Sequence, residues 1–133
     1  MNLTHWIIGL ALVFPAHAFA DELTAPSVWE NQSGSLLYVD EIEADGRFDG
    51  RYVNGAVGYS CQGIEYDVEG RILDPLITFD VVWQAASETC HTITSWTGKI
   101  SGDVIETEWS LVRMNAAGEF GRFEGVSRFE RQD

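Results

Sequence analysis

The chain has 133 residues, which is enough for one domain with one hydrophobic core. Its formal net charge is −13 at pH 7, and an acidic surface of this kind repels phosphate backbones, so nucleic acid is not expected as a partner. No segment of the sequence is apolar and long enough to span a bilayer, so no membrane is expected as a partner either.

The first 20 residues have the features of a secretory signal peptide. The apolar run at residues 6–14 is followed by Ala18-Phe19-Ala20, a pattern of small residues around one large residue that is typical of a cleavage site. We therefore predict cleavage after Ala20, leaving residues 21–133 as the mature domain, rather than a buried N-terminal strand or helix. The mature domain is expected to be secreted or periplasmic.

The rest of the chain is expected to consist of short strands, because Val, Ile, Thr, Tyr, Phe and Trp are frequent and Gly or Asp-Gly separates them. "ADGRF" (44–48) and "ISGDV" (100–104) are typical of hairpin turns. The eight predicted strands cover residues 27–31, 35–44, 48–54, 63–72, 76–84, 91–100, 103–114 and 121–131. Even spacing favours an all-β, eight-stranded antiparallel up-and-down barrel, which has no exposed edges; a two-sheet sandwich is the alternative.

Charged residues mark the outer face of each predicted strand, because strand side chains alternate between two faces. The opposite, inner positions are Phe79, Val81, Trp83, Thr92, Thr94, Trp96, Thr107, Trp109, Leu111, Phe123, Gly125, Ser127 and Phe129. The same alternation places Tyr52 beside Asn54 and Trp29 beside Asn31, with Trp29 expected to pack in the core. Buried hydroxyls and amides need hydrogen-bond partners. These groups either hydrogen-bond to each other or to ordered water, or they line a pocket for a polar, neutral ligand.

The two cysteines, Cys61 and Cys90, predict one disulfide in an exported chain. It would close a loop of about 30 residues and contribute about 3–4 kcal/mol. Two cysteines with His91 do not supply four ligands, so no metal site is expected. His91 is the only histidine of the mature chain and no nucleophile is marked beside it, so no enzymatic activity is expected.

Five segments in order resemble the avidin and streptavidin family over about 100 residues: "WENQSGS" (29–35), "DGRYVNGAVG" (49–58), "FDVVWQ" (79–84), "TITSWTGKI" (92–100) and "IETEWSL" (105–111). The spacing is similar to that of the short, dimeric, rhizavidin-like bacterial branch, whose disulfide maps onto Cys61 and Cys90. The resemblance implies a barrel that binds biotin at one end without catalysis and without a cofactor.

The resemblance also implies a role for each site residue. Asn31, Ser35 and Tyr52 would donate hydrogen bonds to the ureido oxygen of biotin. Asn54 would face a ureido N–H, Thr94 would donate to the ring sulfur, and Thr92 would contact the tail carboxylate. The apolar walls would be Trp83, Trp96 and Trp109.

Two departures from the family pattern matter. "GVSRF" puts Ser127 where streptavidin-like members have an Asp that accepts from a ureido N–H. A hydroxyl accepts without charge assistance, so we expect a loss of about 1–2 kcal/mol. The chain also has no Trp after Trp109, where tetrameric members place one to cap a neighbour's ligand. This favours a homodimer.

Two other functions are compatible with a small exported barrel. One is a lipocalin-like carrier of another small hydrophobic ligand, which would need a wide apolar cavity. The other is a protease inhibitor that acts through a protruding N-terminal segment, here residues 21–26. A biotin titration alongside a protease-inhibition assay separates these possibilities.

Overall fold

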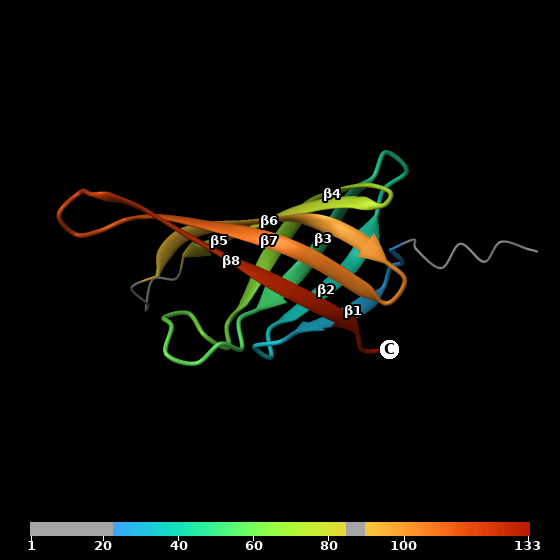
Figure 1. The fold of residues 1–133 in the computed structure, drawn as a ribbon, viewed down its shortest axis with the longest axis horizontal. Helices are drawn as coiled ribbons and strands as arrows, with labels where there is room; N and C mark the ends of the chain where they lie inside the picture. The colour runs from blue at the N-terminus through green and yellow to red at the C-terminus, as the bar shows by residue number, and fades with distance from the viewer. Residues whose placement is uncertain (1–22, 85–89) are drawn as a thin grey trace, which may run out of the picture.

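The computed structural model describes residues 23–84 and 90–133, which form eight antiparallel strands closed into a barrel (Figure 1). The predicted signal peptide lies outside the described residues. Each strand pairs with the next, and β8 pairs back with β1. The strands are β1 (Ser27–Asn31), β2 (Leu36–Ile42), β3 (Arg47–Val53), β4 (Glu65–Leu73), β5 (Leu76–Gln84), β6 (His91–Ser101), β7 (Val104–Met114) and β8 (Phe120–Arg131). The predicted barrel is confirmed, and the sandwich alternative is wrong.

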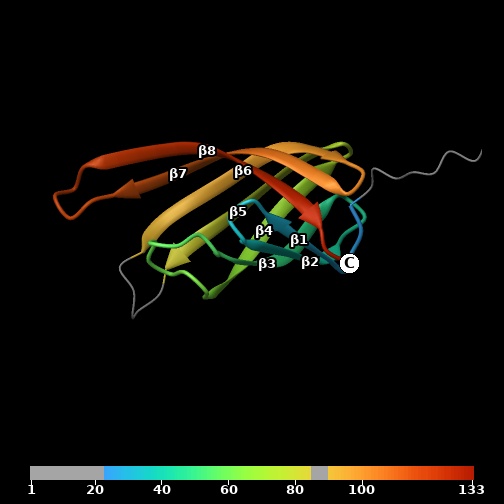
Figure 2. The same cartoon turned by 60° about the horizontal axis from the view of Figure 1, so that its bottom comes forward.

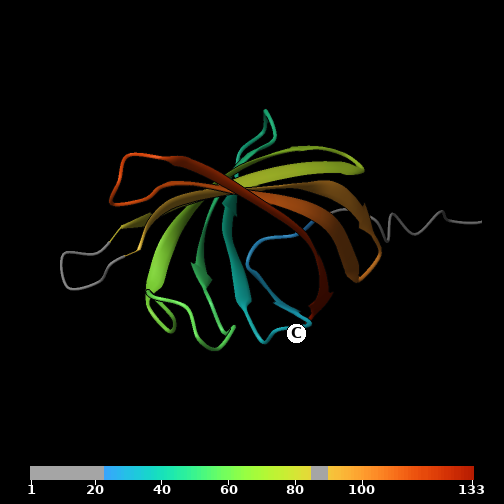
Figure 3. The same ribbon diagram turned by 60° about the vertical axis from the view of Figure 1, so that its left-hand side comes forward.

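The alternation of side chains explains why these segments fold as strands of a barrel. In β5, Ile77, Phe79, Val81 and Trp83 are buried, while every residue between them is exposed. A strand places successive side chains on opposite faces, so this pattern fills the interior from one face and leaves the other in water. Figure 3 shows the strands curving round into one continuous wall.

The barrel has two unlike ends. Short turns join β2 to β3, β4 to β5 and β6 to β7 at one end, which we call the short-turn end. Gly46 and Gly102 lie in two of these turns with φ of 88° and 61°, a backbone conformation that favours glycine, so both predicted hairpin turns are confirmed. The β1–β2, β3–β4, β5–β6 and β7–β8 connections lie at the opposite end, which we call the long-loop end.

The hairpin of β7 and β8 extends well past the other strands at the long-loop end (Figures 1 and 2). This corrects one sequence expectation: strand alternation predicts that Phe123 faces inward, but the residue is 47% exposed. Phe123 pairs with Leu111 on β7, whereas β8 pairs with β1 only over residues 129–131, so β1 has no residue beside Phe123. The guanidinium of Arg113 instead covers its ring at 4.7 Å, a cation–π contact.

The apolar core fills the interior and continues to the short-turn end. Its fully buried members include Leu37, Val39, Phe48, Val68, Phe79, Ile100, Ile105 and Phe129. Trp29 is also fully buried, as expected for a core residue. Within the described ranges, no helix has the length and hydropathy needed to cross a membrane.

Candidate functional site

Asn31 lies at the end of β1, and its side chain faces the barrel interior. Its Oδ1 accepts hydrogen bonds from the backbone N–H groups of Ser33 (3.0 Å) and Ser35 (2.9 Å) in the β1–β2 turn. Since both partners are donors, the amide orientation is fixed and the Nδ2 group must point the other way. Nδ2 lies 3.4 Å from both the Tyr52 hydroxyl and Ser127 Oγ, which are long contacts for a hydrogen bond.

Tyr52, near the end of β3, is 3% exposed and touches the aromatic residues around it. Its ring centroid is 4.8 Å from that of Trp96 and 5.7 Å from that of Trp83. Burial raises the pKa of the Tyr52 phenol to about 12, and a hydrogen bond with Ser35 opposes that shift. The phenol therefore stays protonated at neutral pH and keeps a hydrogen to donate.

Ser35 connects the β1–β2 turn to the loop that follows β3. Its Oγ donates to Asn54 Oδ1 at 3.2 Å and accepts from the Gly55 N–H at 3.0 Å. The two backbones approach so closely that a Cβ on Gly55 would lie 2.3 Å from the Gly34 carbonyl oxygen. Asn54 Oδ1 also accepts from the Ala56 N–H at 3.0 Å. The two loops thus hold Ser35 and Asn54 side by side.

Three tryptophans occupy the inner face of β5, β6 and β7. Trp83 and Trp96 are buried at 7% and 4% exposure, and Trp109 is half-buried. Trp96 stacks on Phe79 with a centroid separation of 4.9 Å and an interplanar angle of 13°. Trp109 lies over Gly125, where a Cβ would come within 2.3 Å of the indole ring. A glycine at this position of β8 therefore makes room for the tryptophan.

Two indole N–H groups at the site differ in their partners. Trp83 Nε1 donates to Thr94 Oγ1 at 2.9 Å. Trp96 Nε1 is buried and has no hydrogen-bond acceptor among the described residues. Since a buried donor without a partner costs about 1–3 kcal/mol, the orphaned N–H is a feature that a packed core would avoid.

The structure brings the predicted site residues to the long-loop half of one barrel interior. Asn31, Ser35, Thr94 and Ser127 are buried, and Thr92 and Asn54 are half-buried. Ser127 faces inward on β8, opposite Thr107 on β7. Sequence alternation missed Tyr66, which is 9% exposed and packs its ring 5.0 Å from Trp83. Its position between the acidic residues of β4 was the available signal.

The predicted disulfide is confirmed between Cys61 and Cys90, which are 29 residues apart. It ties the loop after β3 to the residue that precedes β6, so it braces the long-loop end. No side chain among the predicted site residues is charged at neutral pH. The described part of the chain also contains no group of three or more His, Cys, Asp or Glu residues placed to hold a metal ion.

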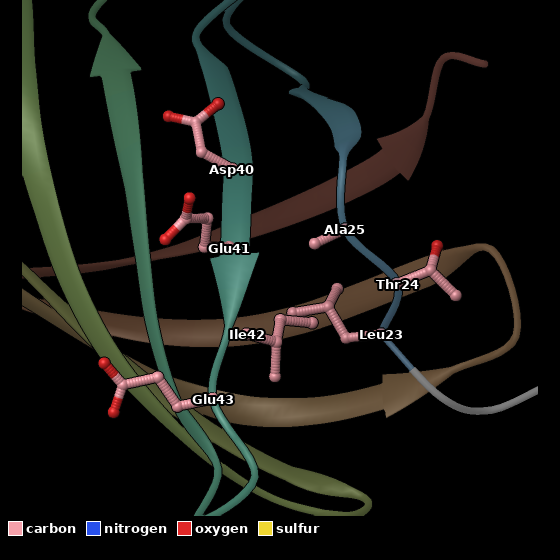
Figure 4. Close-up of a pocket in the computed structure, with 7 residues that line it drawn as sticks. All are labelled: Leu23, Thr24, Ala25, Asp40, Glu41, Ile42 and Glu43. Atoms are coloured by element: carbon pink, nitrogen blue, oxygen red, sulfur yellow. The ribbon is translucent and has the colours of Figure 1, made fainter.

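An open groove at the short-turn end is separate from this site (Figure 4). It lies between the segment before β1 and the end of β2, and it is lined by Leu23, Thr24, Ala25, Asp40, Glu41, Ile42 and Glu43. Two of its carboxylates already have partners, because Asp40 pairs with Arg51 and Glu43 with Arg47. The groove contains none of the residues predicted to bind a ligand.

Comparison with known proteins agrees with the fold and the arrangement of the site. The Avidin family model matches residues 19–120. Afifavidin from Afifella pfennigii is 39% identical over 89 residues, which cover 64% of this chain and 55% of afifavidin. The chain thus matches about half the length of that relative.

Two solved structures with biotin are also similar to this chain. The bradavidin2–biotin complex superposes with a TM-score of 0.75 at 33% identity, covering 83% of this chain and 99% of bradavidin2. The rhizavidin–biotin complex superposes with a TM-score of 0.75 at 33% identity, covering 83% of this chain and 93% of rhizavidin.

Proposed function

This chain belongs to the avidin family, and from that membership we propose that it binds biotin, without catalysis, at the long-loop end of the barrel. The observation that carries the proposal is the convergence of three hydrogen-bond donors on one point of the interior. Asn31 Nδ2 lies 3.4 Å from the Tyr52 hydroxyl, and Ser35 lies near enough to the same hydroxyl to oppose the rise in its pKa. Groups this close together can all reach one acceptor atom.

The ureido oxygen of biotin is the acceptor that fits these donors. Asn31, Ser35 and Tyr52 would each donate to it in a site shielded from water, where hydrogen bonds are electrostatically stronger. The Asn31 amide is already turned by the backbone of the β1–β2 turn, so its donor needs no reorientation. Preorganised donors lower the entropic cost of binding.

Asn54 and Ser127 would accept hydrogen bonds from the two ureido N–H groups. In the structure the Ser35 hydroxyl donates to Asn54 Oδ1. When Ser35 turns its hydrogen to the ureido oxygen, Asn54 Oδ1 is released to accept from the ligand. One rotation of the Ser35 hydroxyl thus provides a donor for the ureido oxygen and frees an acceptor for a ureido N–H.

The rest of the ligand is apolar except for its carboxylate. Trp83, Trp96 and Trp109 would enclose the fused rings and the alkyl tail, because indole rings bury a large area of apolar surface. Thr94 would donate to the ring sulfur, and the half-buried Thr92 would contact the tail carboxylate.

We propose in addition that the mature protein is secreted or periplasmic and forms a homodimer, with the outer face of β5, β6 and β7 as its contact surface. Val82 and Ile93 are cross-strand partners on this face and are 56% and 44% exposed. Val112 is the partner of Ile93 on the next strand. Size-exclusion chromatography with light scattering should give a dimer for the wild type and a monomer for Ile93→Asp. A stable tetramer would contradict the proposal.

The test of biotin binding is a calorimetric titration with tryptophan fluorescence recorded in parallel. We expect one biotin per chain, a favourable enthalpy and a change in the tryptophan spectrum. Tyr52→Phe keeps the ring and removes one donor, so it should weaken binding roughly tenfold. Tyr38→Phe removes the same hydroxyl from a tyrosine of β2 that lies under Arg51, and it should leave the affinity unchanged.

Absence of heat and of a spectral change would contradict biotin binding. A lipocalin-like carrier would then be tested with apolar ligands, and an inhibitor with a panel of proteases. Equal affinities of the wild type and Tyr52→Phe would contradict the role of the three donors.

A further inference from the structure

One row of side chains crosses the inner face of the barrel near the long-loop end. Trp83 on β5 lies opposite Thr92 on β6, and Thr92 lies opposite Arg113 on β7. Cross-strand partners point to the same face of a sheet, with Cβ atoms about 5 Å apart. Arg113 is therefore the direct neighbour of the residue that is proposed to contact the tail carboxylate of the ligand.

The Arg113 side chain leans across the hairpin of β7 and β8 toward Phe123. Arg113 pairs with Gly121 on β8, two residues before Phe123, so Arg113 and Phe123 are diagonal neighbours on the inner face. The guanidinium carbon lies 4.7 Å from the centroid of the Phe123 ring. A Cβ on Gly121 would lie 3.6 Å from Arg113 Cγ and Nε, so the side chain passes over the glycine. The exposed ring of Phe123 is thus the surface that holds the guanidinium.

The Arg113 guanidinium makes no ion pair and no hydrogen bond among the residues that the structure describes. A guanidinium has five N–H donors, and a cation–π contact does not use them as an ion pair does. Within the described strands of the long-loop half, Arg113 is also the one basic residue with the inward alternation. Its charge is therefore available to an anion at the mouth of the site. Other arginines of this acidic chain form ion pairs with carboxylates: Arg47, Arg51, Arg122, Arg128 and Arg131.

We propose that Arg113, held over Phe123, is a specificity-determining residue that selects ligands by the charge of their tail, so that the protein prefers free biotin to conjugates whose tail ends in an uncharged amide. This inference rests on the proposed biotin binding. The net charge of −13 repels an anionic ligand as it approaches. A guanidinium beside Thr92 offsets that repulsion at the point where a tail carboxylate would lie, and it can donate two N–H groups to it. A neutral amide gains neither effect.

The test compares biotin with biotinamide, which has the same rings and tail but an uncharged carboxamide in place of the carboxylate. Dissociation constants for both ligands are measured with the wild type, Arg113→Gln and Arg113→Lys. Arg113→Gln should reduce the preference for biotin over biotinamide roughly threefold to tenfold, and it should leave the binding of biotinamide nearly unchanged. Arg113→Lys keeps the charge but not the planar set of donors, so it should retain part of the preference.

Arg122→Gln is the matched control. Arg122 lies on the outer face of the same hairpin, where it pairs with Glu124 at 3.2 Å, and its replacement changes the net charge by the same amount. The preference for biotin should therefore persist in this variant. Phe123→Leu removes the aromatic surface under the guanidinium and should reduce the preference by less than Arg113→Gln does. Added salt should lower the preference of the wild type, because it screens an ion pair near the surface, and leave that of Arg113→Gln unchanged.

An equal preference for biotin in the wild type and in Arg113→Gln would overturn the inference while leaving biotin binding intact. A loss of preference in Arg122→Gln as large as that in Arg113→Gln would also overturn it, because the effect would then come from the overall charge and not from a contact. If the wild type binds neither ligand, biotin binding itself is contradicted, and the inference with it. Thermal unfolding followed by circular dichroism confirms that each compared variant is folded.

Discussion

The two ends of this barrel differ in whether their buried polar groups have hydrogen-bond partners, and the tryptophans show the difference. Toward the short-turn end, Trp29 donates its indole N–H to Ser27 Oγ at 2.9 Å, and Ser27 in turn donates to the Thr24 carbonyl at 2.6 Å. In the long-loop half, Trp96 is nearly as buried, but its N–H has no acceptor among the described residues.

Hydrogen-bond lengths also differ between polar groups that serve the fold and those predicted to bind the ligand. Thr107, deep in the barrel, donates to the Ser127 carbonyl at 2.8 Å, whereas Asn31 Nδ2 reaches Tyr52 and Ser127 Oγ only at 3.4 Å. Polar groups that serve only the fold find partners within it. Two groups of the long-loop half are exceptions: Asn31 Nδ2 has only long contacts, and the Trp96 N–H has no acceptor among the described residues. Such groups are what a site completed by a ligand requires. Changes at the two ends should therefore affect different quantities.

The largest effect is expected from Phe48→Ala, in the packed short-turn half. Phe48 is 2% exposed and makes an edge contact with Phe79 at 6.3 Å between centroids. Removing a buried phenylalanine should lower the free energy of unfolding by about 3–5 kcal/mol. Chemical denaturation measures this, and the milder Phe48→Leu keeps enough stability for a biotin titration. A large loss of biotin affinity in Phe48→Leu would contradict the idea that the short-turn half affects stability and not binding.

Removal of the disulfide should act at the long-loop end, on stability and on affinity together. The Cys61–Cys90 bond closes a segment of 29 residues, so replacing both cysteines by serine should cost about 3–4 kcal/mol on the chain-entropy model. The loop that carries Asn54 would also lose its covalent link to Cys90, and biotin should bind more weakly. Reductant should reproduce both effects in the wild type and have none in the variant. Unchanged affinity would show that the loop is held by its other contacts.

Alkaline pH should weaken the long-loop half through Tyr52. The pKa of this phenol is raised from about 10 in the unfolded chain to about 12, so the folded state holds the proton more tightly. Its contribution is fully present below pH 10 and is lost as the pH rises toward 12, by up to roughly 2–3 kcal/mol. The difference in unfolding free energy between the wild type and Tyr52→Phe should follow this curve. A pH-independent difference would contradict the burial of the hydroxyl.

The smallest effect is expected from Ser127→Asp, which adds charge assistance to the acceptor for a ligand N–H. We expect biotin to bind more tightly by about 1–2 kcal/mol and to dissociate more slowly. Ser127→Asn, which is similar in size to Asp but uncharged, is the control and should show little of this gain. An unchanged dissociation rate in Ser127→Asp would argue against a ligand N–H at this position.

The strand alternation predicted most of the fold, because a closed barrel has one inside and one outside. The buried set of β5 and the inward direction of Ser127 follow from this rule, and charged neighbours identify the outer face. Phe123 shows where the rule fails: alternation gives the side of a strand but not whether the strand extends past its neighbours.

The composition of the site was predicted from its resemblance to a family, whereas its hydrogen-bond pattern could not be. The bond from Trp83 to Thr94 and the missing acceptor of Trp96 depend on side-chain rotamers and on which side chains meet inside the barrel, and alternation gives neither. Tyr66 is different, because Glu65 and Asp67 on either side of it mark it as an inner residue by the same alternation.

The most direct test of the division between the ends is the nuclear magnetic resonance spectrum of the tryptophan indole N–H groups, recorded with and without biotin. The signals of Trp83, Trp96 and Trp109 should shift on binding, with Trp96 sensitive because its N–H lacks an acceptor in the protein. The Trp29 signal, held by Ser27, should stay in place. A Trp29 signal that shifts as much as the others, or four signals that all remain unchanged, would contradict the account.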